Sequence, residues 1–254
     1  MKALKWIGGA VGWVMGGPLG GLLGFAVGHM FEGLTSGKYA LDNPPSGQTG
    51  TTPRRPSRPE TGEGDFGLCL LVLSAAVMKA DQQVKRSELD FVKAFFKRQF
   101  GQEKAAQYIL ILRELLQKDY QLDDICGQIR HMMDYASRLQ LLHYLFGLSL
   151  SDGQAARQEL EIIQSIAHQL GLSQPDFESV KAMFVKDATS AYKVLEIAPD
   201  ATDEEVKKAY KKMAVKHHPD KVSHLGEDVR RQAEEKFKEI NAAYEQIKKE
   251  RGLV

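Results

Sequence analysis

The sequence has few cysteines, little net charge and one long stretch without any charged residue. Two cysteines, Cys69 and Cys126, in 254 residues exclude a disulfide framework and a zinc site built from repeated Cys-x-x-Cys pairs. The formal net charge of +1 gives no overall attraction to nucleic acid, so no nucleic-acid partner is expected. No nucleophile–base set and no phosphate-cradling loop is visible, so we expect neither an enzyme nor a bound cofactor.

The uncharged stretch runs from Trp6 to Phe31, which is 26 residues. About 20 helical residues cross the hydrocarbon core of a bilayer, so residues 1–34 predict a single transmembrane helix. The apolar part is too long for a cleaved signal peptide, and no clear small-residue cleavage site follows it. Glycine recurs at every fourth position, at Gly8, Gly12, Gly16, Gly20, Gly24 and Gly28. Small residues at this spacing let two helices approach closely in lipid, so we expect a homodimer through this helix.

Residues 35–64 contain almost no apolar side chain that could pack into a core. Five of the nine prolines of the chain lie here, together with many Gly, Ser and Thr residues. This composition is typical of a disordered tether, which would let the following domain sit off the membrane.

Residues 65–187 contain one proline, Pro175, placed where a helix can begin. Apolar residues recur at helical spacing in seven segments, which start at Leu68, Leu89, Ile109, Ile125, Leu141, Leu160 and Phe177. Seven helices of this kind would form a compact bundle with an adequate core.

Two stretches within this domain match each other at an offset of 71 residues. Each copy places an Asp and a Glu seven residues apart across a helix start, and the four acids are Asp81, Glu88, Asp152 and Glu159. Such acids cap helices, but four converging carboxylates could also bind calcium or magnesium. The first copy has Gln82 where the second has Gly153, which leaves the geometry of the first loop open. The region resembles the TerB-like fold named from tellurite-resistance proteins, where such acidic positions have been linked to metal binding.

The tripeptide His218-Pro219-Asp220 stands between two amphipathic helical segments. The first segment starts after a hydroxyl cap, Thr202, and its buried stripe is Val206, Ala209, Tyr210, Met213 and His217. Its opposite side carries Lys207, Lys208, Lys211, Lys212 and Lys216. The second segment begins near Asp228 and has the stripe Phe237, Ile240, Tyr244 and Ile247. Pro219 cannot continue a helix, so we expect a helical hairpin with the tripeptide at its tip.

Residues 188–254 resemble the J domain, by which DnaJ-type co-chaperones drive ATP hydrolysis in DnaK-type chaperones. The resemblance rests on the short segment 191–197, the basic helix, the tripeptide and the run from Phe237 to Tyr244, in that order. It implies that His218, Pro219 and Asp220 contact the nucleotide-binding domain and linker of the chaperone. It also implies that the five lysines dock on that chaperone.

The whole order of segments resembles that of membrane-anchored DnaJ-like co-chaperones. We therefore expect an all-α protein with a transmembrane helix, a tether, a TerB-like helical bundle and a C-terminal J-domain hairpin. The resemblance implies the bacterial inner membrane, with the C-terminal domains in the cytoplasm, because the DnaK-type partner is cytosolic. The alternative is a membrane stress-response or metal-binding protein in which the TerB-like domain sets the role.

Overall fold

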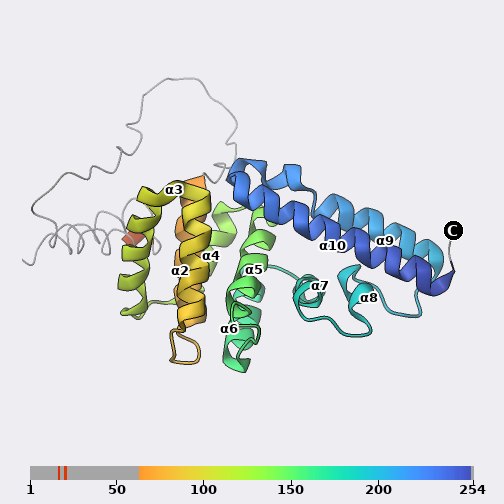
Figure 1. The fold of residues 1–254 in the computed structure, drawn as a ribbon, viewed down its shortest axis with the longest axis horizontal. Coiled ribbons are helices and arrows are strands. Elements are labelled where there is room, and N and C mark those ends of the chain that lie inside the picture. The colour runs from red at the N-terminus through yellow and green to blue at the C-terminus, as the bar shows by residue number, and fades with distance from the viewer. Residues whose placement is uncertain (1–16, 18–19, 22–62, 253–254) are drawn as a thin grey trace, which may run out of the picture. The chain divides into compact units, whose positions relative to one another are not determined.

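The computed structural model describes residues 17, 20–21 and 63–252, and all secondary structure in residues 63–252 is helical, as Figure 1 shows. The elements are α2 (Glu63–Met78), α3 (Arg86–Leu116), α4 (Leu122–Met132), α5 (Tyr135–Ser149), α6 (Arg157–Gln169), α7 (Gln174–Phe184), α8 (Ser190–Val194), α9 (Asp203–Lys216), the 3₁₀ helix η1 (Pro219–Leu225) and α10 (Glu227–Arg251). The predicted all-α fold is confirmed.

The predicted membrane helix and tether lie almost entirely outside the described residues. Of the six spaced glycines only Gly20 is described, and of the tether only Glu63 and Gly64, which already belong to α2. Within the described part of the chain, no helix is long and apolar enough to span a bilayer.

Helix α2 forms the centre of the bundle that α2 to α7 build. It is apolar on nearly all sides, and its side chains from Cys69 to Leu73 are fully buried. It packs against α3, α5 and α6. A helix that is hydrophobic all round belongs inside a protein, and this explains why α2 is in the middle.

Two of the seven predicted helices are joined in α3. The chain leaves helical geometry at Gly101 (φ 79°, ψ 168°) and then resumes it, so the apolar segments that start at Leu89 and Ile109 lie on either side of a kink. A positive φ favours glycine, because an L side chain would be strained there. The kink lets Phe96 in the first half pack against Tyr108 in the second, with ring centroids 4.9 Å apart.

Helices α9 and α10 form the predicted hairpin. The α9 N-terminus is a capping box, in which the Thr202 Oγ1 accepts from the Glu205 N–H at 3.3 Å and Glu205 Oε2 accepts from the Thr202 N–H at 2.7 Å. Between the helices, Tyr210 stacks on Tyr244 with centroids 4.3 Å apart, and the Tyr210 hydroxyl donates to Asn241 Oδ1 at 3.0 Å. Aromatic stacking and a partly buried hydrogen bond therefore fix the register of the two helices.

The hairpin shares an apolar cluster with α7 of the bundle. Ala182 and Met183 of α7 belong to the same buried cluster as Leu195, Val206 and Ile240 of the C-terminal part. The Ser179 hydroxyl of α7 also donates to the Val194 carbonyl at the end of α8, at 2.8 Å. The last bundle helix thus contributes to the core of the hairpin, which composition and periodicity did not predict.

Candidate functional site

The His-Pro-Asp tripeptide lies at the turn between α9 and α10. His218 is extended (φ −64°, ψ 130°), and Pro219 begins η1. The Asp220 backbone N–H donates to His218 Nδ1 at 3.3 Å, and the His218 ring packs edge-on against Phe237 with centroids 5.9 Å apart. The Asp220 side chain is 87% exposed and the His218 side chain 50%. The backbone of the tripeptide is thus ordered while both side chains remain accessible.

Four of the five predicted lysines form an exposed basic face on α9: Lys207, Lys208, Lys211 and Lys212. Of these, Lys212 also pairs with Glu196, with 3.0 Å between Nζ and Oε2. Val215, at 64% exposure, lies beside them. Lys216 differs from the prediction, because its side chain is only 15% exposed and its ammonium pairs with the buried carboxylates of Asp176 and Glu196.

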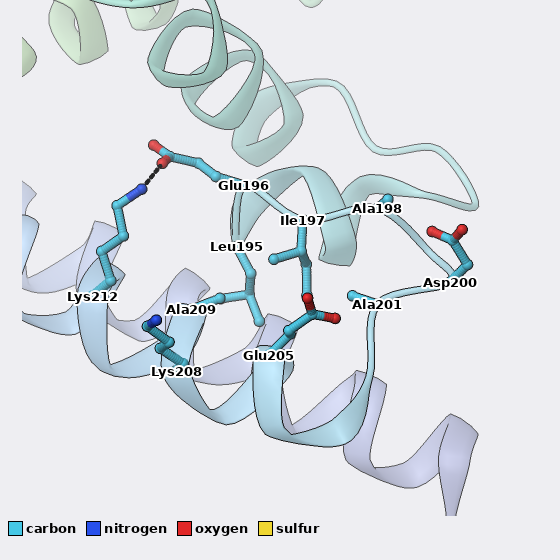
Figure 2. Close-up of a pocket in the computed structure, with 10 residues that line it drawn as sticks. All are labelled: Leu195, Glu196, Ile197, Ala198, Asp200, Ala201, Glu205, Lys208, Ala209 and Lys212. Carbon is cyan, nitrogen blue, oxygen red and sulfur yellow. Dashed lines mark hydrogen bonds and ion pairs between the residues drawn. The ribbon is translucent and has the colours of Figure 1, made fainter.

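A hollow of about 630 Å³ borders the basic face. Figure 2 shows it between α9 and the segment that joins α8 to α9, with Lys208 and Lys212 on one side and Ile197 opposite. Its apolar floor includes Leu195 and Ala209, whereas its rim carries acids as well as lysines. Because charges of both signs line it, the hollow has no clear preference for an acidic or a basic ligand.

Helix η1 was not predicted, and it fixes the loop that follows the tripeptide. Its side chains Val222 and Leu225 are buried, and it packs against α5 and α2 of the bundle. The Leu225 carbonyl accepts from Gln99 Nε2 at 2.9 Å, and Arg98 pairs with Asp228 at 3.2 Å. The signal for this helix in the sequence was the spacing of three residues between the apolar side chains Val222 and Leu225.

The two acidic loops adopt the same local geometry. Asp81 Oδ1 accepts from the Gln83 N–H at 2.9 Å, and Asp152 Oδ1 accepts from the Gln154 N–H at 3.1 Å. Gln82 takes a left-handed conformation (φ 62°) at the position where Gly153 has φ 87°. The loop geometry is therefore kept in the first copy, although a non-glycine residue is strained there.

Lys85, which the sequence did not mark as a site residue, connects the two acidic loops. Its ammonium lies 3.0 Å from Asp152 Oδ2 and 3.3 Å from Glu159 Oε1. Glu88 turns back to accept from the Lys85 backbone N–H at 2.8 Å, so it completes a cap at the start of α3. The acids thus bind an ammonium and cap helices.

Glu88 and Glu159 are buried carboxylic acids. The pKa of Glu88 is raised to about 7, mainly by burial and also by the nearby Glu159 charge, against the lowering effect of the Lys85 N–H. Burial also raises the pKa of Glu159, although Lys85 opposes this. Among the described residues, no group of three or more His, Cys, Asp or Glu side chains is arranged to hold a metal ion. Metal binding by the four acids stays a prediction.

Three family models match consecutive parts of the chain. Residues 1–38 match the co-chaperone DjlA transmembrane domain, residues 68–182 match the tellurite resistance protein TerB, and residues 190–252 match the DnaJ domain. The matches give a membrane domain at the N-terminus, a TerB domain from α2 to α7, and a J domain that contains the hairpin.

Curated relatives match over nearly the whole length. The co-chaperone protein DjlA of Coxiella burnetii is 25% identical, over 99% of this chain and 100% of its own. Those of Photobacterium profundum and Vibrio parahaemolyticus are 26% and 29% identical, over 98% and 91% of this chain and 99% and 91% of their own. No solved structure matches the chain.

Proposed function

Because the chain belongs to the DjlA family of membrane-anchored J-domain co-chaperones, we propose that it recruits a DnaK-type chaperone and stimulates the ATPase of that chaperone. In this proposal His218, Pro219 and Asp220 contact the chaperone, and the chain itself catalyses no reaction. The observation that carries the proposal is the tip of the α9–α10 hairpin, where the exposed Asp220 carboxylate stands on an ordered turn. An ordered turn loses little entropy on docking, so its contacts add to affinity.

The basic face supplies the second part of the proposal. Lys207, Lys208 and Lys211 are exposed on the same helix that leads into the tripeptide. Clustered exposed charge speeds the encounter with an oppositely charged surface more than it adds affinity. We infer that these lysines and Lys212 steer an acidic surface of the chaperone toward the tip, and that Lys216 takes no direct part.

We further propose that the protein lies in the bacterial inner membrane with its TerB and J domains in the cytoplasm. The support is the transmembrane-domain match over residues 1–38 and the cytosolic location that the proposed partner requires. A homodimer through the glycine ladder would place two J domains near each other at the membrane.

Steady-state ATP turnover by a DnaK-type chaperone, with the full chain added in detergent micelles, tests the function. We expect Asp220→Asn to abolish the stimulation, because the substitution removes the exposed charge and keeps the shape of the side chain. The matched control is Asp200→Asn, which removes an exposed carboxylate of the J domain away from the tip. Stimulation by Asp220→Asn within twofold of the unmodified chain would refute the proposed function.

A further inference from the structure

The last lysine of the basic helix points into the protein. The Lys216 ammonium pairs with Asp176 in the first turn of α7 and with Glu196 after α8. Both carboxylates are buried, with side-chain exposures of 0% and 5%. Removing one partner from a buried charge pair leaves the other charge less well compensated, so this contact links the J domain to the TerB domain.

Asp176 is itself held in place by the TerB domain. The Ser173 backbone N–H donates to Asp176 Oδ2 at 2.8 Å, and the Tyr135 hydroxyl donates to the same oxygen. Burial raises the pKa of Asp176, but the hydrogen bonds from Lys216, Ser173 and Tyr135 outweigh burial and lower the pKa to about 2. The carboxylate is therefore charged at every pH at which the protein works, and its position is fixed by α5 and α7.

The residue after Lys216 is also anchored in the TerB domain. His217 is buried and meets His143 of α5 edge-on, with ring centroids 5.6 Å apart. Burial lowers the pKa of His217 to about 4, so the ring is neutral at pH 7. Lys216 and His217 thus fix the chain immediately before His218.

The C-terminal end of the loop also contacts the TerB domain. Gln99 donates a hydrogen bond to the Leu225 carbonyl, and Arg98 forms an ion pair with Asp228. The loop is therefore fastened at both ends to the TerB domain, and the exposed Asp220 lies between the two attachments. A loop held in this way is already ordered before a partner arrives, which reduces the entropy lost on binding.

We propose that Asp176 is a positioning residue for the His-Pro-Asp loop, which it holds in the docking conformation through Lys216. This rests on the proposed function, because the loop matters only if it contacts a chaperone. Asp176 is buried and pairs with Lys216, so we expect its effect on docking to pass through Lys216 and the end of α9. The TerB domain then helps to hold the J domain in the conformation that binds the chaperone.

The test uses the full chain in detergent micelles and measures chaperone ATP turnover against co-chaperone concentration. Asp176→Asn keeps the side-chain shape and removes the charge that holds Lys216. If the docking conformation falls to about a third of the population, the concentration for half-maximal stimulation rises about threefold, while maximal stimulation is unchanged. Backbone amide hydrogen exchange should become faster in residues 216–225 and stay the same in α6.

Three further variants define what the result means. The double variant Asp176→Asn with Lys216→Met should have the same half-maximal concentration as Asp176→Asn alone, because Asp176→Asn has already broken the ion pair between the domains. Glu196 still has Lys212 as a partner in the double variant. Lys216→Arg keeps the ion pair with Asp176 and should behave like the unmodified chain. Glu161→Gln removes an exposed carboxylate that pairs with Arg157 on α6 and should change nothing.

A half-maximal concentration that is unchanged in a folded Asp176→Asn chain overturns the proposal. A lowered one also overturns it, because Lys216 would then be a docking residue that Asp176 withholds. If Asp176→Asn does not fold, Tyr135→Phe decides by the same criteria, since it removes one hydrogen bond and no charge. Asp220→Asn in the same assay separates this outcome from failure of the proposed function, because it tests the loop and leaves the anchor intact.

Discussion

Replacing Glu88 with Gln is expected to stabilise the protein above neutral pH. Glu88 is 2% exposed, and its pKa rises from an ordinary value of 4.5 to about 7, mainly through burial. The folded state therefore binds more protons than the unfolded state between these two values. Stability falls as the pH rises through this window, because the carboxylate must ionise inside the protein. Glutamine keeps the oxygen that accepts from the Lys85 N–H and never ionises.

The size of the effect follows from the pKa difference. At 1.36 kcal/mol per pH unit, the rise to about 7 sets a ceiling of about 3 kcal/mol on the destabilisation by Glu88 at pH 8. Water that enters the folded structure on ionisation reduces this, so we expect Glu88→Gln to gain about 1–2 kcal/mol at pH 8. Below pH 4.5 the two chains should be equally stable, since Glu88 is then neutral in both states.

Urea unfolding of residues 61–254, which form one compact unit, measures the difference at pH 4.5, 6, 7 and 8. His217 acts in the opposite direction, because its pKa of about 4 means that stability is lost as the pH falls from 6.5. This contribution is the same in both chains and cancels in the comparison. The control is Glu161→Gln, which removes an exposed carboxylate. A difference between Glu88→Gln and the unmodified chain that does not grow with pH refutes the reasoning.

Three further predictions concern the loops, the basic face and the membrane segment. Gln82→Gly should stabilise residues 61–254 by about 1 kcal/mol in urea unfolding by relieving the left-handed strain, whereas Gly153→Ala should destabilise them; equal midpoints would contradict this. Reversing Lys208 and Lys211 to Glu should slow association with the chaperone severalfold at low salt and less at high salt, measured by stopped-flow; indifference to salt would remove the steering role. Replacing Gly12, Gly16 and Gly20 with Leu should keep membrane insertion and lower crosslinking of residues 1–34; equal crosslinking would show that the glycine ladder does not pair two helices.

The helical segments could be predicted because the signals for them are local. The cap at Thr202 with Glu205 and the stop at Pro219 are patterns of neighbouring residues, and the structure contains both. The apolar segments that start at Leu89 and Ile109 were predicted as two helices, whereas the structure joins them in α3, which is interrupted at Gly101. Such features depend on fewer than ten consecutive residues, and a single sequence contains them in full.

Contacts between distant segments could not be predicted in the same way. Lys85 and Glu159 are 74 residues apart, and nothing in the pattern of either loop shows that a lysine would take the place between the acids. The assignment of Lys216 to the basic face failed for a similar reason. On an isolated helix Lys216 continues the row of lysines, and only the folded chain brings Asp176 of α7 to it.

The position of Lys216 indicates that the J domain depends on the TerB domain for part of its structure. If all five lysines of α9 were exposed, the basic helix would make no ion pair with the TerB domain, and that domain would serve only to connect the J domain to the membrane segment. Here the ion pair with Asp176 and the shared core of Met183 with Leu195 make α7 part of the J domain in physical terms. If the proposed function holds, we expect a substitution in the TerB domain to change chaperone stimulation without any contact with the chaperone. We therefore expect mildly destabilising substitutions in α5 or α7 to weaken docking on the chaperone, and only strongly destabilising ones to unfold the protein.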